Sequence, residues 1–405
     1  MFRSLIVFAF LGTSVTGFAA QFTIESAVTY AVAHNPDLAA ARFSIAEARA
    51  RLLGSGRLSN PELEADLRPN VLGREFSFGL GFVQRFPLTN RLRLEKAVSL
   101  AEVTTAEAEV LATEVKLGTA VRTVAVKMLS LEGSKTLKEK QIANSRELAA
   151  SATKIAASGE GSGLEATQFE LEAQQLSLDL LTLESERATL TGEARPLIGV
   201  TVSETVEFTG SLPAVGVPGE ASPNIIARPD YQAARARIEA ARQGIALAKA
   251  NKWADAGVGL GAEVDRLEDA PDGLQTEGII SLKFSLPLPF WNKNEGKIQE
   301  AEAIAARAEK EAEALAARVR AEAMAALGEM RAARRILDEI SNVLLPKALQ
   351  IEEKISSFYK QSQPGVLLPD VLRSREKRLA IEQAKLDALR SYHLASIRWN
   401  AAMGR

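Results

Sequence analysis

The sequence contains no cysteine, only two histidines, few aromatic residues and no large excess of charge of either sign. Without cysteine the chain forms no disulfide bond, offers no thiolate to a metal and has no cysteine for lipid attachment. The 49 basic and 51 acidic side chains give a formal net charge of -2, so the composition indicates no nucleic-acid partner. Long stretches rich in Ala, Glu, Leu and Arg favour long helices over a compact enzyme.

Residue types that usually carry catalysis or metal binding are not grouped. His34 and His393 stand alone, with no carboxylate or second histidine at ligand spacing, and are expected to be surface or packing residues. The glycines at 159–163 lack the lysine of a phosphate-binding loop, and no nucleophile elbow of the form Gly-x-Ser-x-Gly occurs. We therefore expect no catalytic site, no cofactor and no metal site.

The N-terminus has the pattern of a secretory signal peptide. Arg3 precedes an apolar run from Leu5 to Leu11, and small residues follow up to Ala20. We assign 1–20 as the signal peptide, with cleavage near its end. After position 20 no apolar run reaches about 18 residues, so we expect no transmembrane helix in the mature chain.

The rest of the chain reads as a tandem duplication. Asn35-Pro36-Asp37-Leu38 is echoed by Arg228-Pro229-Asp230-Tyr231, and each copy is followed by a helical segment, two strands and a very long helical stretch. A linker rich in proline and glycine separates the halves. The predicted organisation is a first repeat at 21–209, a linker at 210–224 and a second repeat at 225–405.

Each half contains two segments in which apolar residues alternate with polar or small ones, at 62–67 and 76–82 and at 258–265 and 280–286. The alternation is typical of strands that face lipid on one side and water on the other, although a half-buried sheet in a soluble domain also produces it. Four strands leave open edges, so spanning a membrane requires several chains to share one barrel. The residues assigned to the lipid face are Phe76, Phe78, Leu80, Phe82, Ile280, Leu282 and Phe284.

Two long helical hairpins account for most of the remaining chain. The first covers 88–195 with a break at the glycines of 159–163, and the second covers 294–404 with a kink at Pro346 and a break at Gln363-Pro364-Gly365. At 1.5 Å per residue, a helix of about 65 residues is on the order of 100 Å long. The charges along these helices are expected to form solvated faces with i,i+4 pairs, and some of them to line a water-filled lumen.

Several motifs, taken in order, resemble the TolC family of outer-membrane efflux channels, and within it the heavy-metal branch of CzcC-like and CusC-like proteins. The resemblance covers essentially the whole mature chain. The motifs are Asn60-Pro61-Glu62-Leu63 before the first strand, Gln84-Arg85-Phe86-Pro87-Leu88 after the second, the run from Pro287 to Gly296 after the fourth, and the run from Tyr359 to Leu372 at the second helical tip.

The resemblance implies a mainly α fold with a small β part. Duplicated helical hairpins would form a periplasmic α-barrel, and four strands per chain would contribute to a transmembrane β-barrel shared by a homotrimer. It also implies a non-enzymatic channel in the outer membrane of a Gram-negative bacterium, in contact with outer-membrane lipid. The implied partners are a periplasmic adaptor protein and an inner-membrane efflux transporter, and the heavy-metal branch implies metal cations as cargo.

The same resemblance assigns site residues at the second tip. In the family an Asp-Val-Leu-Asp run narrows the closed tunnel, and here the run is Asp370-Val371-Leu372-Arg373, so Arg373 replaces the second acid. We hypothesise that rings of Asp370 and Arg373 pair and hold the entrance closed, although an ordinary i,i+3 surface pair would explain the spacing equally well. The tips that would contact the adaptor are Gly159, Gly161, Ser162, Gly163 and Leu164, and Gly365, Val366 and Leu367.

Two other functions fit part of the pattern. A periplasmic adaptor is also secreted and built on helical hairpins, but it has one hairpin flanked by β-rich domains, whereas this chain has two hairpins. A soluble coiled-coil scaffold would leave the four alternating strands unexplained.

Overall fold

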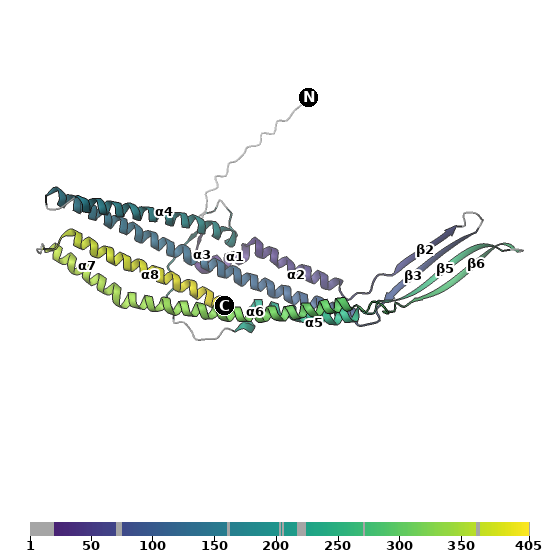
Figure 1. The fold of residues 1–405 in the computed structure, drawn as a ribbon. Coiled ribbons are helices and arrows are strands. Elements are labelled where there is room, and N and C mark those ends of the chain that lie inside the picture. The colour runs from purple at the N-terminus through teal and green to yellow at the C-terminus, as the bar shows by residue number, and fades with distance from the viewer. Residues whose placement is uncertain are drawn as a thin grey trace, which may run out of the picture. The chain divides into compact units, whose positions relative to one another are not determined.

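The computed structural model describes residues 20–69, 75–159, 163–201, 204, 206–216, 224–269, 272–361 and 365–404 (Figure 1). The chain forms two compact units, and each predicted repeat contributes to both of them. The bundle unit comprises residues 1–39, 114–223 and 320–405, and the sheet unit comprises residues 40–113 and 224–319. The signal peptide and the repeat limits remain predictions.

Long helices build the bundle unit, as the proline-free stretches predicted. They are the C-terminal part of α3 (Arg91–Ala157), α4 (Leu164–Ile198), the end of α6 (Glu295–Glu339), α7 (Leu345–Lys360) and α8 (Leu368–Ala402). The predicted breaks fall between α3 and α4 and between α7 and α8. The interruption expected at Pro346 is a π-helical turn at Ile340–Leu344.

Side-chain contacts give the directions of these helices. Lys138 pairs with Asp179 at 2.8 Å and Lys135 with Glu184 at 3.9 Å, so α3 and α4 are antiparallel. The Asn144 side chain donates to the Leu372 carbonyl at 2.9 Å, which ties α8 to α3. A Cβ at Gly133 would lie 2.9 Å from Leu386, so this glycine lets α8 approach α3 closely.

The bundle core is built largely from small side chains. Ala323, Ala326 and Ala333 of α6 pack against Ala388, Ala395 and Trp399 of α8. Short side chains let helix backbones approach within the roughly 8–10 Å typical of packed helices. The segment 211–216 lies against this core, because Val215 packs against it and the Tyr392 hydroxyl donates to the Gly216 carbonyl at 2.7 Å.

A small helix and two very short strands complete the bundle unit. Helix α1 (Ile24–His34) begins at a capping box in which the Thr23 side chain accepts a hydrogen bond from Ser26. Strand β1 (Ala20–Phe22) pairs in parallel with β4 (Val206–Phe208). The alternation pattern had not indicated these strands.

Helices of the sheet unit are also joined by ion pairs along their lengths. These helices are most of α2 (Pro36–Gly54), the first part of α3, α5 (Pro229–Ala250) and the first part of α6, and a 3-10 turn at Ile225–Ala227 precedes α5. Arg242 pairs with Glu309 at 2.8 Å and Lys249 with Glu302 at 3.4 Å, so α5 and α6 are antiparallel.

The four predicted strands form one antiparallel sheet in the order β2-β3-β5-β6. Their bounds are β2 (Glu62–Pro69), β3 (Phe76–Phe86), β5 (Ala256–Asp269) and β6 (Gly273–Ser285). Strand β3 of the first repeat pairs with β5 of the second, so the sheet depends on both halves of the duplication.

Candidate functional site

One face of the sheet is apolar and exposed. Register places Phe78 opposite Val264, and Phe82 opposite Leu260, which itself faces Leu282. The seven residues predicted to face lipid all lie on this face, and their side chains are between 38% (Phe76) and 83% (Ile280) exposed. Leu63 and Leu67 of β2 extend the same face. Apolar patches of this size are rarely left to water.

The opposite face of the sheet carries charges and glycines. Glu64 of β2 and Lys283 of β6 come within 3.7 Å of each other, although these are the two edge strands. Glycines of the middle strands lie between these two side chains, because a Cβ at Gly81 would lie 3.7 Å from the Glu64 Cβ and one at Gly259 would lie 3.6 Å from the Lys283 Cβ. A polar hollow of about 210 Å³ lies on this face, lined by Glu64, Arg85 and Lys283 among others.

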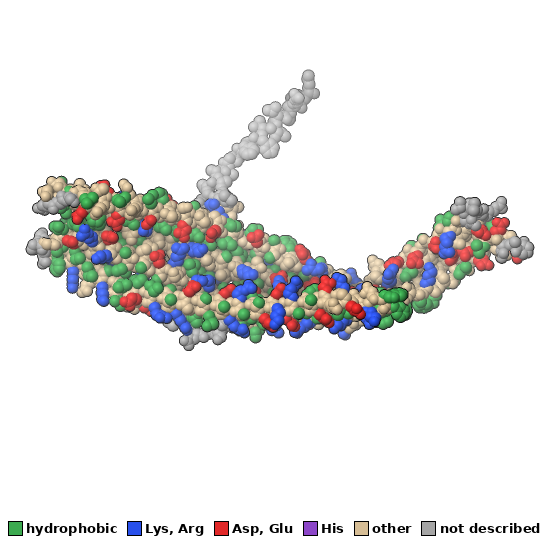
Figure 2. All heavy atoms as spheres, viewed as in Figure 1, with side chains coloured by type: hydrophobic (Ala, Val, Ile, Leu, Met, Phe, Trp, Pro, Cys, Tyr) green, Lys and Arg blue, Asp and Glu red, His purple; other side chains and the backbone are tan. Residues whose placement is uncertain are grey.

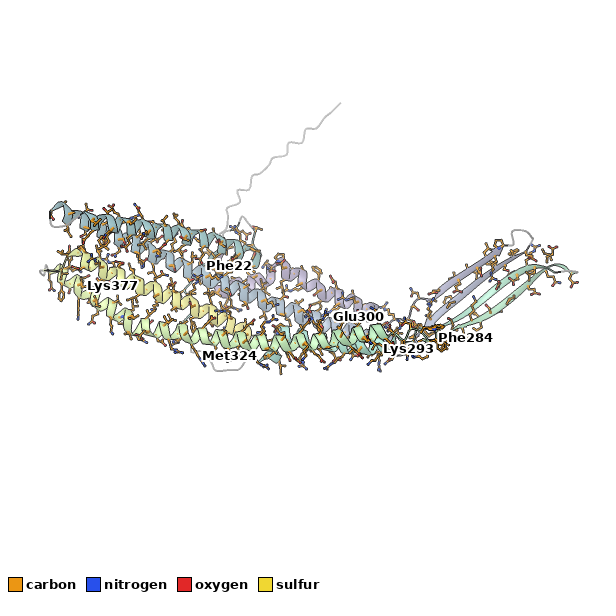
Figure 3. All side chains as sticks on the ribbon, in the orientation of Figure 1. Phe22, Phe284, Lys293, Glu300, Met324 and Lys377 are labelled. Carbon is orange, nitrogen blue, oxygen red and sulfur yellow. The ribbon has the colours of Figure 1, made fainter. Side chains whose placement is uncertain are left out.

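Exposed aromatic and leucine side chains gather where the strands meet the helices of the sheet unit (Figures 2 and 3). We call this set the interface belt: Phe86, Leu88, Trp253, Leu286, Leu288, Phe290 and Trp291. Trp291 is 96% exposed, and its ring lies edge-on to that of Phe290 with the centroids 6.2 Å apart. Exposed lysines lie one residue before Trp253 and two residues after Trp291 in the sequence. Tryptophan and lysine are the residue types that favour the boundary between lipid and water.

The predicted docking tips lie at the ends of the two hairpins in the bundle unit. Gly159 and Gly365 have positive φ angles of 81° and 91°, a conformation that glycine adopts without strain and that ends α3 and precedes α8. Gly163, Leu164 and Leu367 are exposed, and Val366 is half-buried. Gly161 and Ser162 lie outside the described residues.

The two predicted gate residues do not pair with each other within the chain. The Asp370 carboxylate accepts a hydrogen bond from the Leu367 backbone N–H at 2.9 Å, so it caps the start of α8. The Arg373 side chain is exposed and makes no ion pair with an acid among the described residues. Asp370 thus has a structural role that the sequence comparison had not suggested.

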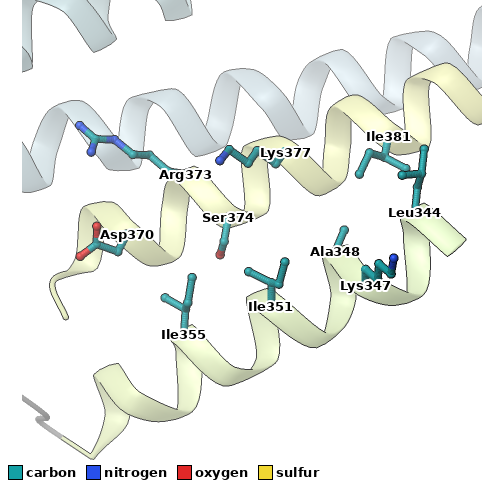
Figure 4. Close-up of a pocket in the computed structure, with 10 residues that line it drawn as sticks. All are labelled: Leu344, Lys347, Ala348, Ile351, Ile355, Asp370, Arg373, Ser374, Lys377 and Ile381. Carbon is teal, nitrogen blue, oxygen red and sulfur yellow. The ribbon is translucent and has the colours of Figure 1, made fainter. Parts of the chain in front are cut away.

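A groove lies between α7 and α8 next to these residues (Figure 4). Its volume is about 440 Å³. Ile351 and Ile355 point from α7 toward α8, and Ser374 points back from α8. We call it the α7/α8 groove, and its lining residues are Leu344, Lys347, Ala348, Ile351, Ile355, Asp370, Arg373, Ser374, Lys377 and Ile381.

A network of ion pairs holds α8 to its neighbours beside the groove. Arg378 donates to Glu352 of α7 at 2.5 Å and also to Glu382 of α8. Arg375 reaches Glu147 of α3 at 3.0 Å. Burial and the charge of Glu376 on α8 both raise the pKa of the Glu172 carboxyl on α4. No signal in the sequence distinguished these charged residues from the many others on the helices.

Neither histidine lies in a site for chemistry. His34 stacks on Tyr30 with the ring centroids 4.0 Å apart, and His393 is buried, where burial lowers its pKa. Across the described part of the chain, no cluster of three or more His, Cys, Asp or Glu residues is placed to hold a metal ion. No described helix is both long and apolar enough to cross a membrane.

Comparison with known proteins identifies the fold. No protein-family model and no curated sequence matches the chain. Among solved structures, CusC is 19% identical with a TM-score of 0.73, over 96% of this chain and 93% of that one. The outer membrane protein VceC of Vibrio cholerae is 18% identical with a TM-score of 0.72, over 94% and 96% of the two chains.

The Campylobacter jejuni CmeC outer membrane channel is 15% identical with a TM-score of 0.74, over 94% of this chain and 85% of that one. These similarities extend over nearly the whole length of the described fold. The predicted combination of long helices with a small four-stranded antiparallel sheet is confirmed, and the chain has the fold of the TolC-family outer-membrane channels.

Proposed function

We propose that this protein is the outer-membrane exit channel of a tripartite efflux system. The observation that carries the proposal is the sheet, which has large exposed apolar side chains on one face and charges and glycines on the other. Strands that face lipid on one side and a watery lumen on the other need this arrangement. The similarity in fold to CusC, which forms a transmembrane channel, and to two outer-membrane proteins supports the same function.

The channel conducts passively and catalyses no reaction. Edge strands β2 and β6 each have one unpaired side in a single chain, and pairing between copies satisfies those backbone groups. A homotrimer is the proposed assembly, with the apolar face against outer-membrane lipid. The hairpin tips at 159–164 and 365–367 would contact a periplasmic adaptor, which links the channel to an inner-membrane transporter.

The proposed gate lies at the start of α8. In a symmetric trimer, Asp370 and Arg373 would each recur around the axis about one helical turn apart. Arg373 makes no ion pair among the described residues of its own chain, so it is free to pair with Asp370 of another copy. Such pairs would hold the periplasmic entrance closed.

Metal cations were the cargo implied by the heavy-metal branch. The chain is about as similar to VceC as to CusC, 18% against 19% identity, so the comparison favours no branch. The comparison therefore supports the channel function and assigns no cargo to it.

Membrane fractionation tests the location. We expect the protein to stay in the outer-membrane fraction after washes with alkaline carbonate and to be released only by detergent. The purified protein should then form discrete conducting units in a planar lipid bilayer. Release by salt or carbonate alone would favour an adaptor or a soluble scaffold.

Single-channel recording tests the gate. Asp370→Ala and Arg373→Ala should each raise the open probability or the conductance, because each removes one partner of the closing pairs. Arg373→Asp should also raise cation selectivity. Lys354→Ala is the matched control, since it removes an exposed charge of α7 that does not line the groove. If the gate variants conduct as the parent does, the entrance is closed elsewhere.

A further inference from the structure

The α7/α8 groove has the size and the surface to hold a small ligand. Its volume of about 440 Å³ lies within the roughly 300–1,000 Å³ typical of small-molecule sites. Leu344, Ile351, Ile355 and Ile381 form an apolar floor (Figure 4). The π-helical turn at Ile340–Leu344 interrupts the helix just before α7, and the short side chain of Ala348 leaves room between the two helices.

The charged residues of the groove are mostly basic. Lys347 comes from α7, and Arg373 and Lys377 from α8, whereas Asp370 is the one acid among the lining residues. One carboxylate oxygen of Asp370 already accepts a hydrogen bond from the Leu367 N–H at the start of α8. None of the three bases makes an ion pair with an acid among the residues that the structure describes.

Among the described residues, the other arginines of α8 are paired with acids, unlike Arg373 in the groove. Arg375 pairs with Glu147 at 3.0 Å, and Arg378 pairs with Glu352 and Glu382. Arg373 and Lys377 are four residues apart, on one face of the helix, and lack such acids. The arginines that join α8 to its neighbours are thus neutralised by acids, whereas no described acid neutralises Arg373 or Lys377 in the groove.

We propose that the α7/α8 groove binds a small anionic amphiphile, such as an aryl or alkyl sulfonate or carboxylate. The apolar floor takes its hydrocarbon part, and the Arg373 guanidinium, with Lys377 one turn away on α8, takes the anionic group, while Lys347 adds positive charge at the other end of the groove (Figure 4). Resting on the proposed exit-channel function, this assigns anionic amphiphiles as a class of cargo and disfavours metal cations at this point. A bound anion would also compete with Asp370 of another copy for Arg373.

Binding of matched aromatic probes tests the assignment. The full-length protein in phosphatidylcholine nanodiscs is titrated calorimetrically with naphthalene-2-sulfonate and with 2-naphthyltrimethylammonium, and empty nanodiscs are subtracted. The two probes share a ring system and differ in charge. We expect the sulfonate to bind at least about tenfold more tightly, a difference of about 1.4 kcal/mol.

Charge reversal makes the test specific to the groove. The double variant Arg373→Glu with Lys377→Glu should reverse the preference, and both substituted side chains are exposed, so the fold should tolerate them. Lys354→Glu, on α7 but outside the groove, should leave the preference unchanged. Ile351→Ser should weaken binding of both probes. Circular dichroism verifies that each variant is folded, and Arg373→Gln with Lys377→Gln replaces the double reversal if it is not.

Equal affinities for the two probes, or an equal response to Lys354→Glu, would overturn the proposal. Absence of binding would also overturn it, and would indicate that a second copy covers the groove in the oligomer. The channel function is judged separately by conductance. If the protein conducts but does not prefer the sulfonate, the channel function stands and the proposed binding site is wrong. If it binds the sulfonate but does not conduct, the binding site stands and the channel function is wrong.

Discussion

The sheet exposes its large apolar side chains, whereas the bundle core buries small ones. In the sheet, Phe78, Leu80 and Leu282 stand exposed on one face. In the bundle core, Ala326 and Ala395 are almost completely buried between α6 and α8. Large side chains cover a surface that an apolar solvent can wet, and small ones let helix backbones pack closely in water.

This difference in burial indicates which surroundings stabilise the sheet and which stabilise the bundle core. The bundle core buries its apolar side chains between α6 and α8, so this packing is stable without lipid. The sheet has its paired strands but no protein layer on its apolar face, so that face needs lipid or another molecule. Substitutions should therefore act through the surrounding solvent in the sheet and through packing in the bundle.

The largest effect is expected on the exposed apolar face of the sheet. Leu282→Lys and Phe78→Lys should each cost about 2–4 kcal/mol of folding free energy in a bilayer, because lysine near the midplane must be desolvated. The measurement is the denaturant dependence of folding into lipid vesicles.

The adjacent position supplies the control for this prediction. Ser281→Lys places the same charge on the opposite face, across from Gly261 and diagonal to Glu263 on the neighbouring strand, and should cost clearly less. Equal costs at positions 281 and 282 would mean that lipid does not distinguish the two faces.

The sequence predicted the sheet well because its signal is local. Alternation over a few residues is enough to assign a strand and its two faces, and each predicted segment falls within or largely within β2, β3, β5 or β6. The structure extends these strands, most of all β6, which begins at Gly273 rather than at 280. The helix breaks were also predictable, since glycine and proline act on the chain next to them. The repeat pattern then indicated the order of the elements.

Features that depend on distant contacts were missed. Strands β1 and β4 have three residues each and pair across most of the first repeat, so neither carries a recognisable pattern. The α7/α8 groove depends on helix spacing and on which bases lack acids, and the sequence gives neither. Asp370 was found by resemblance, but its role as a helix cap needed the backbone of Leu367.

A second, smaller effect tests how tightly the bundle unit is packed. Gly199 ends α4 with a φ of 82°, and a Cβ there would lie 2.5 Å from the His34 carbonyl oxygen. Gly199→Ala should therefore lower stability by about 1–3 kcal/mol, as measured by thermal unfolding.

Gly192, inside the same helix, is the matched control. A Cβ there would meet no atom within 4 Å, so Gly192→Ala should raise stability by about 0.5–1 kcal/mol through helix propensity. If both substitutions destabilised the protein to the same extent, close packing at the end of α4 would not be the cause.

A third effect concerns the buried histidine of the bundle. Burial lowers the pKa of His393, and the Pro213 carbonyl opposes this only in part. Because the folded pKa lies below the unfolded value of about 6.5, stability is present above that pH and is lost as the pH falls below it. The melting temperature should fall less between pH 7.5 and 5 in His393→Gln than in the parent protein, because the variant lacks the buried group that must be protonated. His34→Gln, at an exposed ring, should retain the parent's acid sensitivity.

The smallest effect is expected where α4 meets α8. Burial and the charge of Glu376 raise the pKa of Glu172. A carboxyl whose folded pKa is raised contributes stability below its unfolded pKa of about 4.3, and that contribution is lost as the pH rises through the folded pKa. Glu172→Gln should therefore raise the melting temperature slightly at pH 7.5 and leave it nearly unchanged at pH 4. Glu170→Gln, exposed on the same helix, should have no such effect. A gain of equal size at both pH values would mean that the substitution acts through packing and not through the charge of Glu172. The proximity of Glu172 and Glu376 would then cost the bundle no measurable stability.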